Sequence, residues 1–444
     1  MATIDQEYLN KHPKSAQLFQ ESAEVFADGV THDTRYVTPF PVVMTHASGP
    51  TKWDVDDNEY VDYVCGHGAL ILGHSHPAIS SAVAEQVGKG THLGGNTELE
   101  LRWAKAIKAL VPSVEKLRFH SSGTEATMMA MRLARAYTEK NKVIKFQDHF
   151  HGWHDYANAG SDGGTGGIPK ATWESMIVLP PGDVSVVEET LARDKDVAAL
   201  ITEPTGAHMG QYPLHVPDFL HQLREVTERY GVLLILDEVV TGFRLSSGGA
   251  QVRYGVKPDL TTMAKIVAGG LPGGVVGGKA EVIDMIAHRG DPIWDSTRRV
   301  AHPGTFNANP LSAVAGATCL EVLAREPINE RADAIADRLR KGLNEVLAKM
   351  EVTGVAHGVS SLVLVAFGVE SDPEEVWKIP HETLHTAAKP GAPQGFKRAM
   401  LNAGVDIMGG RGFIVSAAHR EQDVDKTLAA FERCLSSMRQ ENLV

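Results

Sequence analysis

The chain has 444 residues, enough for two or three domains or lobes with a sizeable core. Hydrophobic residues make up 43% and charged residues 22%, as in soluble enzymes, and the formal net charge of −12 argues against a nucleic-acid surface. The three cysteines lack metal-ligand spacing and favour a reducing compartment. The N-terminus has no apolar signal core and no run is as long as a membrane span, so we expect a cytoplasmic protein.

The first 70 residues predict a helix and a hairpin that belong to a small lobe. Residues 15–26 carry apolar side chains at helical spacing, and Gly29 would end this helix. Two β-like stretches, 41–44 and 60–64, follow with the acidic turn 54–58 between them.

Residues 71–315 are predicted to form a large α/β domain. Short apolar runs alternate there with helical patterns, which indicates βαβ units around a mostly parallel sheet flanked by helices. The runs are 117–120, 143–146, 176–179, 198–202 and 232–236. The Gly-rich stretch 159–167 interrupts this pattern, and we expect it to be a mobile active-site loop.

Residues 316–444 change character and predict an α+β lobe, to which the first 70 residues would also belong. Two helices are expected around 335–350 and 424–438, because apolar residues recur there at helical spacing. Strand-like pieces, 361–367 and 413–416, lie between them.

Two functional side chains follow apolar runs of the large domain. Asp237 ends the run 232–236, and Lys265 follows the run that begins at Asp259. The C-terminal ends of strands in open α/β sheets face the crevice where ligands bind. Pyridoxal phosphate (PLP) chemistry needs a lysine for the Schiff base and a carboxylate that keeps the pyridine nitrogen protonated. Alone, such a lysine is usually a solvated residue and such an aspartate usually caps a helix.

Other candidate residues have equally ordinary alternatives when taken singly. Ser122, Gly123 and Thr124 open a helix whose N-terminus could bind a phosphate or only be capped. Phe150 could stack on a flat cofactor or fill the core, and His151 follows it. Glu203 ends a strand, where a carboxylate needs a partner. Thr305 lies in a polar loop and could donate to a phosphate or close a turn.

Taken together, these motifs resemble the class III PLP-dependent aminotransferases, and within them the glutamate-1-semialdehyde aminomutase subgroup. The matching segments are Ser122-Gly-Thr-Glu-Ala126, Phe150-His-Gly152, Glu203-Pro204, Asp237-Glu-Val-Val-Thr-Gly-Phe-Arg244, Thr261-Thr-Met-Ala-Lys265 and Gly304-Thr-Phe-Asn-Ala-Asn309. The resemblance spans nearly the whole chain and implies fold type I, with PLP as the cofactor. It also implies a homodimer with active sites at the subunit interface.

The resemblance implies a role for each matching residue. Lys265 would carry the internal aldimine and shuttle a proton, and Asp237 would pair with the pyridine nitrogen. Val239 would pack on the ring. The Ser122–Thr124 turn would hold the phosphate with Thr305 of the neighbouring subunit. Phe150 would keep ring stacking without the phenol hydroxyl of the aminomutase tyrosine.

Three departures from the aminomutase pattern concern substrate recognition. Arg35 is the only match to the aminomutase Ser-Ser-Pro-Val-Arg segment, and it would bind a substrate carboxylate. His67 replaces a tryptophan. Arg411 stands where the aminomutases carry a glutamate and where the bacterial β-amino-acid aminotransferases of the subgroup carry an arginine.

These departures favour an aminotransferase. Its donor would be a carboxylate-bearing amine, with β-amino acids as candidates, and its acceptor an oxo acid such as 2-oxoglutarate or pyruvate. An aminomutase, which isomerises without releasing the oxo intermediate, is the alternative. A non-catalytic relative is disfavoured because every cofactor-contacting position is filled.

Overall fold

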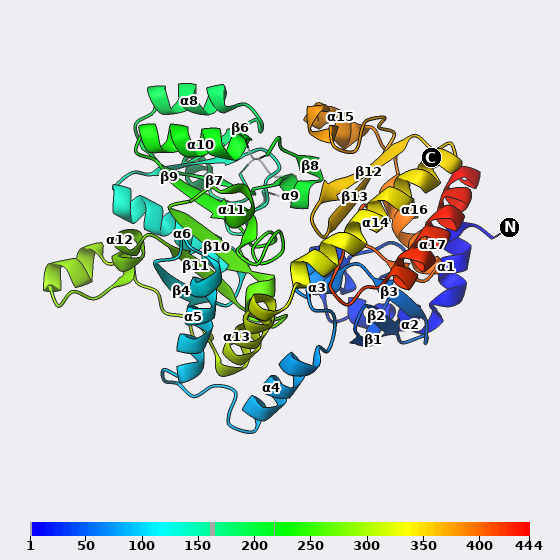
Figure 1. Cartoon of the computed structure of the whole chain (residues 1–444), viewed down its shortest axis with the longest axis horizontal. Helices are drawn as coiled ribbons and strands as arrows, with labels where there is room; N and C mark the ends of the chain where they lie inside the picture. The colour runs from blue at the N-terminus through cyan, green and yellow to red at the C-terminus, as the bar shows by residue number, and fades with distance from the viewer. Residues whose placement is uncertain (1, 160–164, 217) are drawn as a thin grey trace. The chain divides into compact units, whose positions relative to one another are not determined.

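The computed structural model describes residues 2–159, 165–216 and 218–444, and it divides into two compact units. The predicted mobile loop 159–167 falls mainly on residues 160–164, which lie outside this description. One unit comprises residues 77–327, and the other joins residues 1–76 to 328–444 (Figure 1). In the described part of the chain, no helix is both long enough and apolar enough to cross a membrane.

A seven-stranded sheet forms the centre of unit 77–327. Its strand order is β4-β11-β10-β9-β7-β5-β6, and only β11 runs antiparallel to its neighbours. The strands are β4 (Lys116–His120), β5 (Lys142–Phe146), β6 (Met176–Leu179), β7 (Val197–Thr202), β9 (Leu233–Asp237), β10 (Leu260–Ala264) and β11 (Gly274–Gly278). The predicted mostly parallel sheet is therefore confirmed.

Helices cover both faces of this sheet. Along β9, Ile235 packs in the cluster that includes helix α6 (Gly123–Thr138). Its neighbours Leu234 and Leu236 pack in the opposite cluster, with α8 (Val184–Arg193) and α10 (Asp218–Arg229) (Figure 1). Alternate residues of a strand point to opposite faces, so a continuous apolar run is buried on both sides.

The unit formed by the two chain ends is an α+β lobe. It contains a sheet of order β1-β2-β3-β14 and another of order β12-β13-β15. The first sheet has β1 (Met44–Ser48), β2 (Thr51–Asp54), β3 (Glu59–Asp62) and β14 (Val405–Asp406); the second has β12 (Gly354–Val359), β13 (Leu362–Phe367) and β15 (Gly412–Ile414). Parallel pairing of β14 with β3 joins the two ends of the chain in one sheet.

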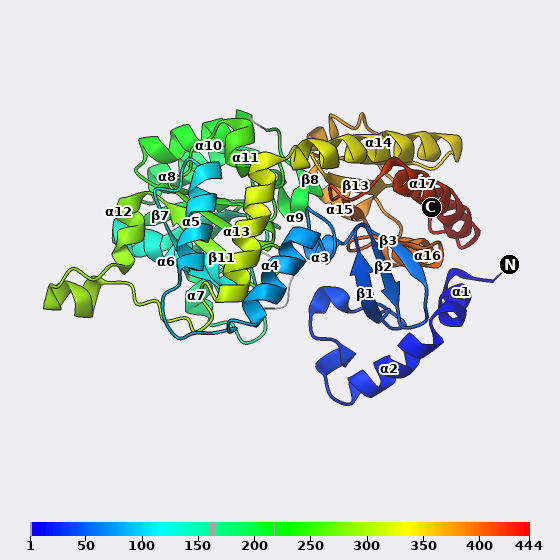
Figure 2. The same cartoon turned by 60° about the horizontal axis from the view of Figure 1, so that its bottom comes forward.

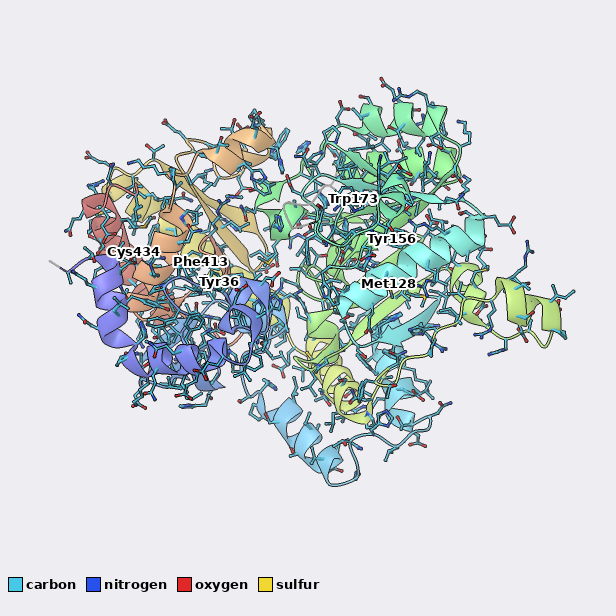
Figure 3. All side chains as sticks on the ribbon, turned by 180° about the vertical axis from the view of Figure 1, so that it is seen from behind. Tyr36, Met128, Tyr156, Trp173, Phe413 and Cys434 are labelled. Atoms are coloured by element: carbon cyan, nitrogen blue, oxygen red, sulfur yellow. The ribbon has the colours of Figure 1, made fainter. Side chains whose placement is uncertain are left out.

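The main helices of this lobe are α1 (Ile4–Lys11), α2 (Pro13–Ala23), α14 (Ile328–Lys349), α16 (Ala392–Asn402) and α17 (Glu421–Gln440). All but α2 contribute buried residues to one large apolar core, and α2 packs against a smaller cluster that includes Phe40 and Tyr60. Helices α14 and α17 correspond to the two predicted C-terminal helices, although α14 ends at Lys349, one residue before the predicted end. Phe413 of β15 and Cys434 of α17 are both buried in this core (Figure 3).

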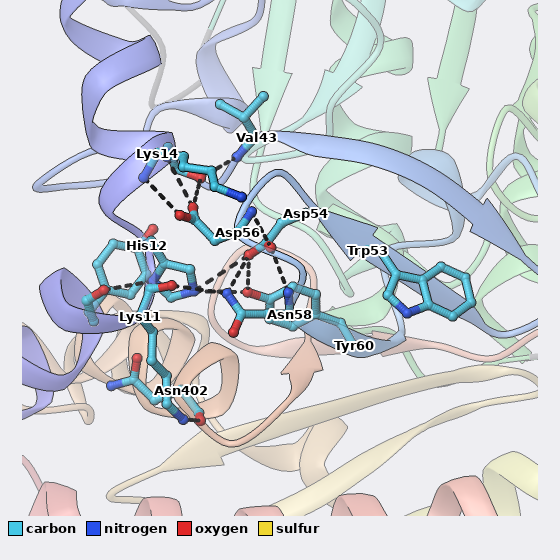
Figure 4. Close-up of polar contacts among 12 residues, drawn as sticks. Lys11, His12, Lys14, Val43, Trp53, Asp54, Asp56, Asn58, Tyr60 and Asn402 are labelled. Atoms are coloured by element: carbon cyan, nitrogen blue, oxygen red, sulfur yellow. Dashed lines mark hydrogen bonds and ion pairs between the residues drawn. The ribbon is translucent and has the colours of Figure 1, made fainter.

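A buried polar network fixes the predicted turn 54–58 to the N-terminal helices (Figure 4). Asp54 Oδ1 accepts from the backbone N–H of Asn58 at 2.8 Å, and its Oδ2 accepts from the Tyr60 hydroxyl at 2.7 Å. The same hydroxyl lies 2.8 Å from His12 Nε2, and His12 Nδ1 lies 2.7 Å from the carbonyl of Tyr8. The acidic turn is therefore partly internal rather than a solvated loop.

The unit boundaries differ from those expected at residues 70/71 and 315/316. The second falls at 327/328, because α13 (Pro310–Arg325) packs against α4 (Pro77–Val87) and α5 (Glu98–Leu110). The first falls at 76/77, because a β-bridge joins His74 to Gly49. Helical periodicity reveals that a segment is a helix but not against which partners it packs.

Candidate functional site

The sheet places Lys265 and Asp237 at adjoining strand ends. Asp237 is the last residue of β9, and its register partner on the parallel neighbour β10 is Thr262. Lys265 directly follows β10 and has a left-handed φ of 55°. A non-glycine residue in this region is strained, and such strain clusters at functional sites.

Asp237 is a buried carboxylate that accepts hydrogen bonds on both oxygens. Oδ1 accepts from the Val239 backbone N–H at 3.1 Å and from the Thr262 hydroxyl at 3.3 Å. Oδ2 lies 2.7 Å from His151 Nδ1. This contact requires a proton on Nδ1, because a carboxylate only accepts. Burial lowers the pKa of His151, and its Nε2 has no hydrogen-bond partner among the described residues.

Glu203 is a second buried carboxyl group of this site, at the end of β7. Its Oε1 accepts from the backbone N–H groups of Phe150 (2.7 Å) and His208 (3.3 Å), and its Oε2 from that of Met209 (3.4 Å). Burial, and then the charge of Asp237, raise the pKa of Glu203 to about 8 despite these donors. Glu203 thus joins the loop after β5 to the turn after β7.

The Ser122–Thr124 turn lies where β4 meets α6. Ser122 caps the helix by accepting from the Glu125 backbone N–H at 3.2 Å, so the alternative in which Thr124 is the N-cap is wrong. The first N–H groups of a helix have no partner within the helix and can bind an anion. A Cβ on Gly123 would lie 3.0 Å from both γ-carbons of Val239. The turn therefore packs directly against the Val239 side chain.

Three further predicted residues surround this set. The Phe150 side chain is 53% exposed, so it is no core residue and its ring is accessible to a ligand. Val239 is half-buried. Thr305 lies in an exposed turn before α13, and its carbonyl lies 2.6 Å from His92 Nε2.

The Lys265 amine has an electrostatic environment suited to nucleophilic and proton-transfer chemistry. Burial is the largest cause of its lowered pKa, and the charge of Arg244 adds to it, against the raising effect of Asp237 and Glu203. A lysine with a lowered pKa is more often in the neutral form that attacks a carbonyl.

The unit thus offers what PLP needs: an amine, a buried carboxylate for the ring nitrogen, and, for the phosphate, the N–H groups of Gly123 and Thr124, which have no partner among the described residues. The absence of a side chain at Gly123 brings the helix N-terminus, which would hold the phosphate, close to Val239, which would hold the ring. The residues present therefore fit this cofactor.

The predicted substrate residues Arg35, His67 and Arg411 all lie in the lobe made by the chain ends. Arg35 is exposed, and its Nη1 donates to the Thr31 hydroxyl at 3.0 Å. Among the described residues, no carboxylate lies within ion-pair distance of the Arg35 or Arg411 guanidinium group. An ordinary surface ion pair therefore does not account for either arginine in this part of the chain.

A pocket of about 680 Å³ in this lobe is lined by Arg35, His67 and the Gly409-Gly410 backbone, which precedes Arg411. Its apolar wall includes Tyr36 and Met408 (Figure 3 labels Tyr36). His67 lies in a left-handed turn, Cys65–Gly68, and stacks on His32 with ring centroids 5.2 Å apart.

Sequence reasoning missed the role of Thr262, Arg244 and Gly274 around this site. Thr262 was recoverable from the register of two neighbouring strands, but only once their order was known. Gly274 belongs to β11, where Val275 and Val276 are the only apolar side chains among glycines, too short a run to predict a strand. A Cβ there would lie 2.2 Å from the Ser122 carbonyl, so only glycine lets β11 pass under the turn.

Comparison with known proteins gives one family. The model described as "Aminotransferase class-III" matches residues 33–392. A glutamate-1-semialdehyde 2,1-aminomutase of Methanopyrus kandleri is 39% identical, over 97% of this chain and 99% of its own. An omega-transaminase structure from Sphaerobacter thermophilus has a TM-score of 0.86 and 33% identity, over 96% of this chain and 98% of its own. A beta-phenylalanine aminotransferase structure from Variovorax paradoxus has a TM-score of 0.84 and 30% identity, over 99% of both chains.

Proposed function

Since the chain belongs to the class III aminotransferases, which use PLP, we propose that it moves the amino group of a carboxylate-bearing substrate with Lys265 as its covalent anchor. The observation that carries this proposal is the placement of Lys265 beside Asp237, at the ends of neighbouring parallel strands. Family membership makes the protein an enzyme; the role of each residue is our inference.

The roles follow from the geometry of unit 77–327. PLP, when bound, supplies an aldehyde that condenses with amines and a ring that withdraws electrons from the substrate carbon. The Asp237 carboxylate would hold the proton on the ring nitrogen, and Phe150 and Val239 would lie against the ring. The N-terminus of α6 would bind the phosphate. Lys265, freed by the incoming amine, would move a proton between the substrate carbon and the cofactor's C4′ atom.

Two reaction types remain candidates, and different observations support them. Overall similarity supports an aminomutase better than an aminotransferase, because the Methanopyrus kandleri aminomutase is 39% identical and the two transaminases are 33% and 30% identical. The sequence motifs favoured an aminotransferase, with an aminomutase as the alternative, and overall similarity reverses this preference.

The substrate-side residues keep the aminotransferase as a second candidate. Arg411 replaces a glutamate of the aminomutase pattern, and His67 replaces a tryptophan. An arginine binds a carboxylate through two parallel hydrogen bonds and stays charged at any working pH. Arg35 and Arg411 have no acidic partner among the described residues, which suits two carboxylate sites for a donor and an acceptor.

The deciding experiment follows the fate of the amino group in purified holoenzyme. A panel of α-, β- and γ-amino acids and glutamate-1-semialdehyde is incubated with and without 2-oxoglutarate or pyruvate. Isomerised product without an oxo acid would establish the aminomutase. Oxo product released with stoichiometric glutamate or alanine would establish the aminotransferase.

The assignment of Lys265 is tested separately. Borohydride reduction of the holoenzyme followed by peptide mapping should place the pyridoxyl group on Lys265, and Lys265→Ala should abolish turnover. A pyridoxyl group on another lysine would overturn the assignment.

The roles of Arg35 and Arg411 are tested through KM for a carboxylate substrate. Losing a buried charged hydrogen-bond pair costs roughly 2–5 kcal/mol, against 0–1 kcal/mol for an exposed ion pair. Arg411→Ala and Arg35→Ala should therefore each raise KM for a carboxylate substrate about tenfold or more, with the cofactor spectrum unchanged. Wild-type half-reaction kinetics in both variants would place carboxylate recognition elsewhere.

A further inference from the structure

Lys145 is a buried lysine that the site described above does not use. It is the fourth of the five residues of β5, two residues after the core residue Val143, and its side chain is fully buried. Lysine is almost never fully buried unless its amine is paired. Its Nζ donates to the carbonyl of Ala157 at 2.7 Å.

The segment 149–157, which begins three residues after β5, carries Phe150 and His151 and is tied to the unit at several points. The Thr127 hydroxyl of α6 donates to the His151 carbonyl at 2.6 Å. The Arg135 guanidinium lies 4.3 Å above the Tyr156 ring, which Figure 3 labels beside the helix that carries Met128. The hydrogen bond from Lys145 to Ala157 fixes the C-terminal end of the segment.

Lys145 also acts on this segment through its charge. The groups that face it electrostatically are Glu203, Asp148, His151 and His154. Burial lowers the pKa of Lys145 to about 8, although Glu203 and Asp148 oppose this effect. Its positive charge in turn helps burial to lower the pKa of both histidines.

We propose that Lys145 is a positioning residue of the cofactor site, which anchors segment 149–157 and keeps His151 as a neutral donor to Asp237. This inference rests on the proposed role of Asp237. A neutral His151 leaves the full negative charge of Asp237 for the ring nitrogen. An imidazolium at this place would neutralise that charge and weaken the pairing.

The test compares Lys145→Met with Lys142→Met. Lys142 lies on the same strand, but its amine pairs with Asp194 at 2.6 Å near the surface, so its loss controls for removing a lysine from β5. Selective ¹⁵N-histidine labelling reports the protonation of His151, assigned with His151→Asn. We expect His151 to stay neutral down to lower pH in the wild type and in Lys142→Met than in Lys145→Met.

The second readout is cofactor binding. Residues that orient metal ligands typically change metal affinity ~10–100-fold when mutated, and we expect the lower end of this range here: Lys145→Met should bind PLP roughly tenfold more weakly, with kcat lowered and KM nearly unchanged. Lys145→Arg keeps the charge and should restore the neutral His151. Unchanged His151 titration and PLP affinity in Lys145→Met would overturn the proposal.

If Lys145→Met does not fold, the apoprotein of Glu203→Gln still decides, because it lacks the other nearby group with a pKa of about 8. The ¹⁵N shift of His151 should then change as pH rises through about 8, where Lys145 loses its proton. A flat response would overturn the proposal. Failure of the proposed function would instead appear as absent turnover, with the His151 response intact.

Discussion

Asp237 differs from an ordinary capping aspartate because its second oxygen is bound by a histidine. A cap residue accepts from the N–H of a residue two or three positions ahead, as Asp237 does from Val239. The contact with His151 instead holds the buried carboxylate in one orientation.

Replacing Asp237 with asparagine separates these two roles. Asp237→Asn would remove the charge that keeps the ring nitrogen protonated, which should raise the barrier by several kcal/mol, about a thousandfold in rate. Loss of a cap alone would cost only about 1 kcal/mol of stability. Single-turnover rates and Tm measured on the same variant decide; a lowered Tm with a near wild-type rate would contradict the proposed role.

Glu203 makes a prediction about stability and pH. Its folded-state pKa of about 8 lies above the ordinary value of 4.5, so the folded protein binds an extra proton between these values. Stability from this group is fully present below about pH 4.5 and is lost as pH rises toward 8.

Glu203→Gln should remove that loss, because the amide stays neutral and keeps an oxygen for the Phe150 N–H. Its Tm relative to wild type should therefore be higher at pH 8 than at pH 5. Glu225→Gln, at an exposed position of α10, serves as the control and should show no such trend. Equal Tm differences at both pH values would show that Glu203 is ionised throughout.

At the scale of elements, the N-terminus of α6 depends on the strand ends beside it. Gly123 has Val239 at 3.0 Å and Ala264 at 3.3 Å from the position of a Cβ, so the helix, β9 and β10 meet at this glycine. The proposed phosphate-binding role of the turn thus requires a small residue for packing rather than for backbone freedom.

Gly123→Ala should push Val239 or the turn aside. Overpacking of this kind costs about 1–3 kcal/mol, and the displaced N–H groups should weaken PLP binding by roughly tenfold. Gly88→Ala is the matched control, because its Cβ would meet only the Glu85 carbonyl at an ordinary 3.5 Å. Equilibrium dialysis with PLP and urea unfolding measure both effects; wild-type affinity in Gly123→Ala would exclude the turn as the phosphate site.

At the scale of the whole molecule, Thr305 predicts a dimer with shared sites. Thr305→Asp would place a negative charge against the phosphate, and Lys265→Ala lacks the anchor, so each homodimer should be inactive. In a mixed dimer, the subunit with intact Lys265 receives an intact Thr305 from its neighbour. Co-refolding the two variants should therefore restore activity, up to one working site per mixed dimer.

Restoration is measured with tagged subunits purified as heterodimers, beside sedimentation of the wild type. No recovery in the heterodimer, or a fully active monomer, would contradict shared sites. Activity in either homodimer alone would indicate contaminating wild-type chains, which mass spectrometry of the two preparations excludes.

Local sequence determined where several strands of the central sheet lie and which residues stand at the strand ends that carry the proposed chemistry. Apolar runs fixed the positions of β5, β7 and β9, and the residues that follow runs, Asp237 and Lys265, were identified as the key pair. These features depend on periodicity and on neighbours in the chain, so they can be read without a partner.

Only the tertiary structure decided what surrounds that pair. The contact between His151 and Asp237, the burial that raises the pKa of Glu203, and the close approach of β11 under Ser122 all join segments far apart in the sequence. Strand order sets such contacts, and strand order depends on how whole elements pack. The glycine-rich β11 has only the short apolar pair Val275-Val276, so its place between β4 and β10 could be found only in the folded sheet.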